Sequence, residues 1–239
     1  MHKFEMPIDY IERVTHLQGR SHTCETFDTV KTALVVVDMQ NYFMHESQQA
    51  ACAMGAKIVP NVNRIADTVR KTGGLVVWVQ NFAPHHSRES WSAMRERFTP
   101  ENQETRWGSM QKDAFGFELW PELDVRAEDA RVVKRRYSAF IQGSSDIEIV
   151  LRDNGIETVL IAGIATNVCC EASARDAMML NFRTAMVSDA CATFSDREHA
   201  ASLGNFYLNF GDVQLTDEII ARLEASDRRN TADAVNAAD

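Results

Sequence analysis

The stretch "ETVLIAGIATNVCCEASARDA", residues 157–177, places a continuous apolar run directly before a segment with helical spacing. The run at 157–165 has the length and the unbroken hydrophobicity of a strand that is buried on both faces of a sheet. The residues that follow predict a helix from about Val168 to Leu180. A buried strand that leads straight into a helix is the repeating unit of α/β proteins, so this stretch indicates an α/β fold.

The same alternation of strand and helix patterns continues on both sides of this stretch. Strands that alternate with helices form a parallel sheet, with right-handed crossovers and helices on both faces. A pair of glycines at 73–74 ends one of the predicted helices. The remaining predicted strands are 32–38, 75–80, 130–136, 183–190 and 212–216, and the remaining predicted helices are 56–72, 143–155, 197–210 and 217–225.

The length of 239 residues fits one large α/β domain, and the alternating pattern occupies residues 32–225. Residues 1–31 are polar and irregular, which predicts an N-terminal arm on the surface. Residues 226–239 are predicted to form a disordered tail. Residues 81–128 are the least regular part of the domain, and we expect short helices and loops there over one end of the sheet.

Charge and composition exclude several classes of protein. The formal net charge is −9 and the pI is near 5.3, which argues against binding to nucleic acid. No apolar run approaches the ~20 residues of a membrane span, and the N-terminus lacks the apolar core of a signal peptide. Five cysteines without a CxxC spacing need no disulfide framework, so we expect a cytoplasmic protein.

Two adjacent cysteines, Cys169 and Cys170, stand at the start of the helix predicted after 157–165. The helical row through Cys170 continues with Ala174 and Ala177, a small apolar stripe that packs closely on a sheet. The row through Cys169 contains Ser173 and begins in the first turn, where backbone N–H groups are free. The spacing therefore predicts Cys169 as the accessible thiol and Cys170 as part of the core.

Three reactive side chains stand where predicted parallel strands end, the edge at which such sheets bind ligands. They are Asp38, Lys134 and Cys169. A helix start and an ammonium group favour the thiolate, a carboxylate can take and return a proton, and backbone N–H groups can hold an oxyanion. The set predicts acyl transfer through a thioester that is then hydrolysed. Each residue also has an ordinary alternative, namely a turn cap, a solvated side chain and a core thiol.

Motifs for metals and common cofactors are absent from the sequence. There is no HxH, HxxxH or CxxC spacing, and no GxGxxG, P-loop or GxSxG motif. We therefore expect neither a metal nor a nucleotide cofactor.

Three segments together resemble the signature segments of the isochorismatase-like cysteine hydrolases. They are "ALVVVDMQNYF" (33–43), "VVKRRYSAF" (132–140) and "GIATNVCCEASARDA" (163–177), and they occur in the family's order. The resemblance covers residues 32–225. It implies a Rossmann-like three-layer αβα fold with a six-stranded parallel sheet, assembled as a homodimer or homotetramer.

The resemblance also implies a catalytic triad. Asp38 would activate the thiol and then protonate the leaving amine, Lys134 would hold the charges of Asp38 and the thiolate, and Cys169 would be the nucleophile. The family has a cis peptide bond before the position of Ala165. In the family this bond aims the N–H groups of Ala165 and Cys169 at the oxyanion.

Within the superfamily, the motifs are most similar to the group of ureidoacrylate amidohydrolases, biuret hydrolases and N-carbamoylsarcosine amidases. Nicotinamidases carry Asp-x-His and further histidines in the segment that corresponds to "QNFAPHHS" (80–87), where this chain has Asn81 and Ala83. Retention of Cys169 favours hydrolysis of a small linear amide or ureide, with release of ammonia or a carbamate. A metal-dependent nicotinamidase and a non-catalytic ligand-binding family member are the alternatives.

Candidate substrate-binding residues follow from the same resemblance. Phe43 lies five positions after Asp38 and would line the pocket by analogy with the family. Each aromatic candidate could equally pack in the core, and each asparagine could equally serve a turn. The further candidates are Gln40, Asn41, Asn81, Trp107, Tyr137 and Phe140.

Overall fold

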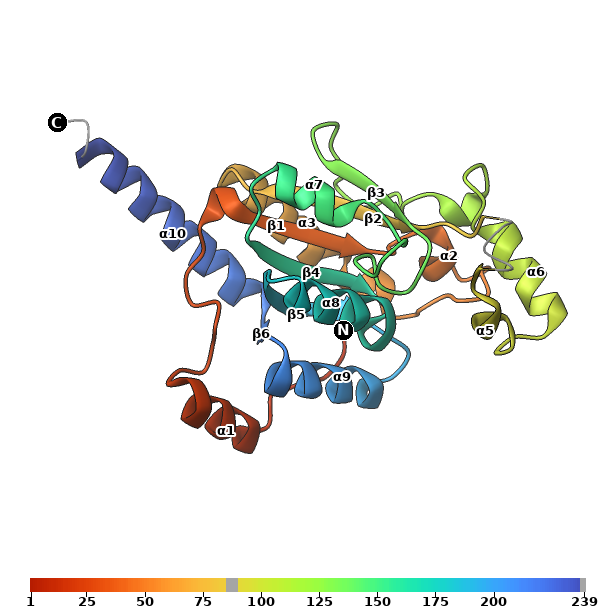
Figure 1. The fold of residues 1–239 in the computed structure, drawn as a ribbon, viewed down its shortest axis with the longest axis horizontal. Helices are drawn as coiled ribbons and strands as arrows, with labels where there is room; N and C mark the ends of the chain where they lie inside the picture. The colour runs from red at the N-terminus through yellow and green to blue at the C-terminus, as the bar shows by residue number, and fades with distance from the viewer. Residues whose placement is uncertain (85–89, 237–239) are drawn as a thin grey trace.

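Six parallel strands form a single sheet in the order β3–β2–β1–β4–β5–β6 (Figure 1). The computed structural model describes residues 1–84 and 90–236. The predicted α/β fold with a six-stranded parallel sheet is confirmed, and every predicted strand is present. The strands are β1 (Thr32–Val37), β2 (Leu75–Asn81), β3 (Ala130–Lys134), β4 (Thr158–Ile164), β5 (Arg183–Ala192) and β6 (Asp212–Gln214).

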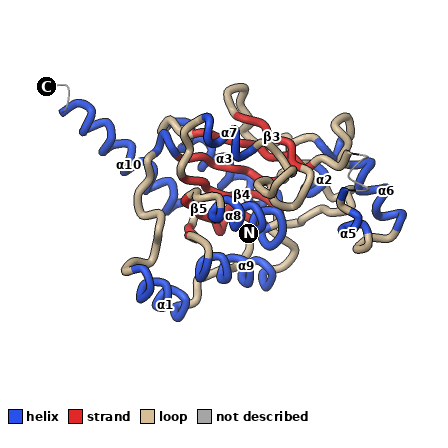
Figure 2. The backbone as a smooth tube through the Cα atoms, viewed as in Figure 1, coloured by secondary structure: helices blue, strands red, loops and turns tan. Residues whose placement is uncertain are grey.

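Helices cover both faces of the sheet, so the domain has three layers. Every residue of β1 is buried, because successive side chains point to opposite faces and both faces are covered. Leu34 and Val36 join the core on one side, and Val35 joins the core on the other. Figure 2 shows the strands lying between helices. One layer holds α3 (Gly55–Lys71) and α10 (Thr216–Asn236), and the other holds α7 (Ile147–Asp153), α8 (Glu171–Met179) and α9 (Asp196–Asn209).

The strand order reverses between β1 and β4, which lie side by side at the middle of the sheet. Chain segments leave the carboxyl ends of these two strands in opposite directions, so a crevice opens there. Asp38 follows β1, and the short π-helical turn η3 (Thr166–Cys170) follows β4. The topology therefore brings these two segments to the position where open α/β sheets bind ligands.

The N-terminal arm is more ordered than its sequence predicts. Within residues 1–31 the structure contains the helix α1 (Ile8–Gln18) and the 3-10 turn η1 (Thr29–Lys31). Val14 of α1 is buried in the core that α9 also covers. Gly19, with φ of +77°, ends the helix. The arm was predicted to be irregular because one buried position on a short helix is too weak a periodic signal.

The C-terminal helix also extends beyond the predicted boundary. The prediction of a disordered tail over 226–239 is wrong for residues 226–236, because α10 continues to Asn236 and projects from the domain in Figure 1. Neither glycine nor proline interrupts this segment, and buried Ser226 accepts a hydrogen bond from the N–H group of Phe27. Residues 237–239 lie outside the described residues.

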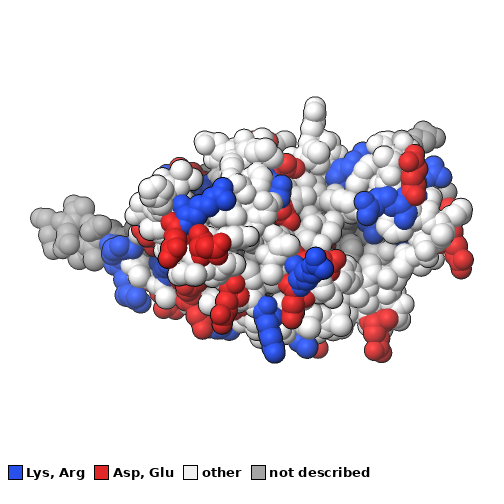
Figure 3. Space-filling model, turned by 90° about the horizontal axis from the view of Figure 1, so that it is seen from below, with Lys and Arg blue, Asp and Glu red and all other residues white. Residues whose placement is uncertain are grey.

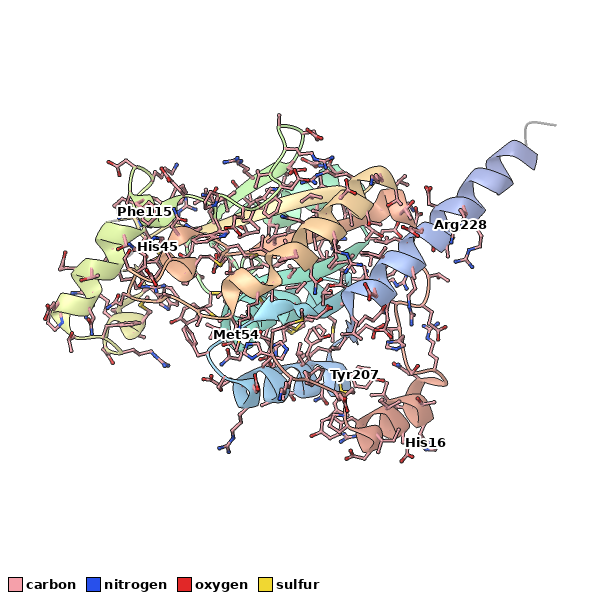
Figure 4. All side chains as sticks on the ribbon, turned by 180° about the vertical axis from the view of Figure 1, so that it is seen from behind. His16, His45, Met54, Phe115, Tyr207 and Arg228 are labelled. Carbon is pink, nitrogen blue, oxygen red and sulfur yellow. The ribbon has the colours of Figure 1, made fainter. Side chains whose placement is uncertain are left out.

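Short helices cover the end of the sheet at which β1 and β2 terminate (Figure 1), and all of them except α2 lie in the segment 81–128, where they were predicted. They are α2 (Asn41–Met44), α5 (Ser92–Arg95), α6 (Pro100–Ser109) and the 3-10 turn η2 (Phe115–Phe117). His45, just after α2, and Phe115 pack edge to face, with their ring centroids 5.1 Å apart (Figure 4). In the described part of the chain, no helix is both long enough and apolar enough to cross a bilayer.

Candidate active site

Asp38, Lys134 and Cys169 meet at the carboxyl edge of the sheet. Asp38 Oδ2 and Lys134 Nζ are 2.8 Å apart, and both side chains are completely buried. Lys134 Nζ also donates to Cys169 Sγ at 3.4 Å. Only 4% of Cys169 is exposed. A carboxylate, an ammonium group and a thiol that are far apart in the sequence thus form one buried cluster.

Backbone geometry at the ends of β1 and β4 brings this cluster together. Asp38 has φ of +55°, a conformation that is uncommon outside glycine and that turns the chain sharply at the end of β1. Gly163 of β4 has φ of +119° and lies so close to β1 that a Cβ atom there would be 2.1 Å from the carbonyl oxygen of Val37. Glycine at 163 is therefore required for β4 to approach β1 one residue before Asp38.

Lys134 is held in place from both ends. Its backbone is paired with Asn81 at the last position of the β2–β3 ladder. Its ammonium group donates to the carbonyl oxygen of Arg136 at 2.9 Å, in addition to its contacts with Asp38 and Cys169. Two hydrogen bonds and one ion pair therefore hold the ammonium group in place.

Burial dominates the protonation of the cluster. Burial raises the pKa of the Cys169 thiol to about 12, although the Lys134 ammonium opposes this rise. Burial also raises the pKa of Asp38, again against the effect of Lys134. The sequence analysis expected the nearby ammonium and the helix start to favour a thiolate. The structure instead favours a neutral thiol next to an Asp–Lys ion pair, because desolvation outweighs the attraction.

The two adjacent cysteines have different environments. Cys170 is completely buried, and only Cys169 of the pair lines the pocket described below. The predicted helix start near Val168 is modified, since η3 forms a π-helical turn before α8 begins at Glu171. The peptide bond between Ile164 and Ala165 is cis, as the resemblance implied.

A pocket of about 430 Å³ opens beside Cys169. Its size lies within the range of small-molecule sites. Its walls come from the segments after β1, β3, β4 and β5, together with α6. The lining residues are Tyr42, Phe43, Gln49, Ala50, Phe98, Asn102, Arg106, Tyr137, Ile164, Ala165, Val168, Cys169 and Phe194.

Four of the predicted pocket residues contact this region. Phe43 and Tyr137 line the pocket itself. Asn81 and Trp107 line a smaller neighbouring cavity of about 20 Å³, which is separated from Cys169 and shares Arg106 with the pocket.

The other three predicted pocket residues have structural contacts. Gln40 donates to the carbonyl oxygens of Asn81 and Phe117 and accepts from the N–H group of Asn81, so it joins β2 to the covering segment. Asn41 donates to the carbonyl oxygen of Phe115. Phe140 packs against Phe182 in the core. These residues lie close to Asp38 or Lys134 in sequence, but none of the three lines the pocket.

The sequence analysis missed the contribution of α6. Asn102 and Arg106 of this helix line the pocket, and they are four residues apart, which places them on one helix face. The four-residue spacing shows that Asn102 and Arg106 share a helix face, but it does not indicate that this face of α6 lies near Cys169. Phe194, which lies in the loop after β5, also lines the pocket and was not predicted to do so.

The alternative of a metal-dependent enzyme requires metal ligands in the segment after β2. Within residues 1–84 and 90–236, no group of three His, Cys, Asp or Glu side chains could hold a metal ion. Asn81 and Ala83, which replace the metal-binding residues of nicotinamidases, are buried. His85 and His86 lie outside the described residues.

The fold and the buried cluster define a parallel α/β protein with a ligand pocket at the carboxyl edge of its sheet. Residues 32–218 match the family described as Isochorismatase domain. The chain is 32% identical over 198 residues to an uncharacterized isochorismatase family protein of Bacillus subtilis, covering 82% of this chain and 96% of that protein. The chain belongs to the isochorismatase family, and the predicted resemblance is confirmed.

Two further relatives are hydrolases. The ureidoacrylate amidohydrolase RutB of Rhizobium rhizogenes is 33% identical over 183 residues, covering 69% of this chain and 72% of the relative. The crystal structure of a cysteine hydrolase from Pseudomonas syringae pv. phaseolicola superposes with a TM-score of 0.75 at 25% identity, covering 84% of this chain and 95% of that one. The predicted hydrolase class is thereby confirmed.

Proposed function

We propose that this chain is a cysteine amidohydrolase that cleaves the C–N bond of a small linear amide or ureide through a thioester, releasing ammonia or a carbamate. One observation carries the proposal: Cys169 contacts the buried Asp38–Lys134 pair and also lines the pocket. The similarity to an amidohydrolase and to a cysteine hydrolase supports it.

In the first step, Sγ of Cys169 attacks the carbonyl carbon of the substrate while the Asp38 carboxylate accepts the thiol proton. The raised pKa of the thiol makes this simultaneous transfer necessary, because little thiolate exists before the substrate binds. The N–H groups of Ala165 and Cys169 hold the oxyanion in this proposal.

In the second step, the tetrahedral intermediate collapses, the C–N bond breaks and Asp38 returns its proton to the leaving amine. Water then attacks the thioester, and Asp38 takes a proton from that water. The C–S bond breaks, and the thiol recovers a proton as the acid product leaves. The raised pKa of Asp38 suits a group that accepts and donates a proton in one cycle.

Lys134 keeps the charges of this cycle balanced. Its ammonium group lies 2.8 Å from Asp38 and 3.4 Å from Cys169, so it contacts whichever of the two carries the negative charge. The positive charge therefore stabilises both ends of the proton transfer without moving.

A screen for ammonia release tests the proposal. The panel contains biuret, ureidoacrylate, carbamoyl amino acids, maleamate and nicotinamide, assayed with the wild type, Cys169→Ala and Cys170→Ala. We expect Cys169→Ala to lower turnover by at least about 10³-fold, whereas the buried neighbour Cys170 tolerates replacement within a few fold. Mass spectrometry of quenched reactions should find the acyl group on Cys169. Full ammonia release by Cys169→Ala would refute the proposal.

The alternative of a metal-dependent nicotinamidase is tested in the same screen. Turnover of nicotinamide that is abolished by a chelator would favour that alternative. All five cysteines are free thiols, which fits the reducing cytoplasm that we propose as the location of the protein.

A further inference from the structure

Arg106 of α6 is a buried cation in the wall of the pocket that contains Cys169. Only 7% of the residue is exposed, although arginine is rarely buried without a partner. Its charge acts on the catalytic cluster, since the guanidinium opposes the burial that raises the pKa of Asp38. The guanidinium therefore lies within electrostatic reach of the proposed chemistry.

Aromatic rings, rather than carboxylates, surround this guanidinium. Its Cζ atom lies 5.6 Å from the centre of the Tyr42 ring and 5.8 Å from that of Phe98. Among the residues that the structure describes, no carboxylate forms an ion pair with Arg106, whereas buried Arg70 pairs with both Asp124 and Asp129. Ring faces hold a cation in place but leave its charge uncompensated.

Among the described residues that line the pocket, Arg106 is the one charged side chain. Asn102 lies one helical turn before Arg106 on α6, and Gln49 accepts a hydrogen bond from the hydroxyl of Tyr42 at 3.0 Å. Other lining residues, including Phe43 and Val168, are apolar. A buried unpaired cation is unfavourable unless a ligand compensates it, and a planar guanidinium matches a carboxylate through two parallel hydrogen bonds.

We propose that Arg106 binds a carboxylate of the substrate, so that the substrate class is a small amide or ureide that carries a free carboxylate. This inference rests on the proposed function of Cys169. The carboxylate pairs with Arg106 at one side of the pocket while the scissile carbonyl meets Cys169 at the other. Neutral amides such as biuret then lack the group that Arg106 requires.

A matched pair of substrates tests this assignment. The first is the best carbamoyl amino acid of the panel, and the second is its carbamoyl amino alcohol, in which CH₂OH replaces the carboxylate. We expect kcat/KM of the wild type to be at least about 100-fold higher for the acid, because a site built for a polar group rejects an analogue that lacks it. Equal values for acid and alcohol would overturn the inference.

Variants of Arg106 test whether this side chain causes the preference for the acid substrate. Arg106→Gln should lower kcat/KM for the acid about 100-fold, mainly through KM, and change the value for the alcohol by less than about threefold. Arg106→Lys keeps the charge but loses the planar fork, so it should give an intermediate acid preference. Arg97→Gln makes the same change in charge at an exposed position before α6 and should match the wild type. An equal loss for both substrates in Arg106→Gln would contradict the assignment.

Binding separates this inference from the proposed function. Calorimetry with Cys169→Ala and with Cys169→Ala/Arg106→Gln measures affinity for the acid and for the alcohol without turnover. Tighter binding of the acid by Cys169→Ala, lost in the double variant, supports the assignment whether or not the acid is hydrolysed. If the acid binds no more tightly than the alcohol, the assignment fails. Turnover that does not depend on Cys169 would instead refute the proposed function.

Discussion

The carboxyl edge of the sheet and the segment that carries α5 and α6 form different walls of the same pocket in different ways. At the sheet edge, Asp38 and Cys169 follow β1 and β4, and Lys134 is the last residue of β3, so the ladder hydrogen bonds of the sheet set their positions. In the α5–α6 segment, Arg106 sits on a ten-residue helix that joins the domain through loops. In the proposed mechanism, the first wall holds the reacting groups and the second contacts the bound substrate.

This difference separates chemistry from selectivity. A parallel sheet cannot move one strand end without breaking its ladders, so the reacting atoms keep their spacing. A short helix between loops tolerates insertion and substitution, which is why binding residues often lie on such segments. Charged side chains of both signs are interspersed over the face shown in Figure 3, so this face does not carry charge of a single sign.

The largest effect should come from Asp38→Asn, which removes the proposed base from the sheet edge. The amide cannot accept the thiol proton, and turnover should fall by about 10³-fold or more. The variant also leaves the Lys134 ammonium buried without its partner, which should destabilise the fold by about 3–5 kcal/mol. Urea unfolding and ammonia release measure the two effects. In Asp38→Asn/Lys134→Met, stability should largely return while activity stays lost, and recovered activity would contradict this assignment.

The spacing between β1 and β4 is tested by Gly163→Ala. The new Cβ atom would stand 2.1 Å from the carbonyl oxygen of Val37, so the strands must separate next to Asp38. We expect a loss of stability of about 3 kcal/mol or more and a fall in kcat. Gly155→Ala is the matched control, since Gly155 also has positive φ but has open space around its Cα, and its cost should be near 1 kcal/mol. Equal costs for the two variants would show that the close approach does not matter.

The pH dependence of kcat/KM should follow the protonation of Asp38. Its carboxylate form is the base, so activity is lost as the pH falls through its pKa. Because burial raises that pKa, the acid limb should lie above the value of about 3.9 for an ordinary Asp. With Asp38 as the base, the rate should level off above that pKa and stay level up to pH 9. A tenfold increase per pH unit across that range would instead indicate attack by a free thiolate, since the pKa of the thiol is about 12.

The smallest effect should come from Thr99→Ala, in the wall that holds α6. The Thr99 hydroxyl accepts a hydrogen bond from the N–H group of Asn102 at 3.3 Å and caps the helix that carries Arg106. Its loss should destabilise the helix by about 1 kcal/mol. We expect a higher KM for the acid substrate with kcat within twofold of wild type. A fall in kcat at constant KM would show that this wall contributes to chemistry as well.

Predictions that rested on local sequence patterns agree with the structure better than predictions that depended on contacts between distant residues. The strands and the positions of Asp38, Lys134 and Cys169 were predicted, because buried parallel strands are continuous apolar runs and their ends meet at one edge. Phe43 and Tyr137 were placed in the pocket by analogy, and they line it. Phe140 was misplaced, because its ring packs against Phe182 in the core and does not line the pocket.

The sequence by itself determined which segments form strands, which family the chain belongs to, and which three residues gather at the sheet edge. Each of these depends on local apolar runs or on short motifs. Only the tertiary structure decided that Cys169 is a neutral thiol and that Arg106 enters the pocket. Both depend on packing by residues far away in the chain. That packing raises the pKa of the thiol and places the rings of Tyr42 and Phe98 against the guanidinium.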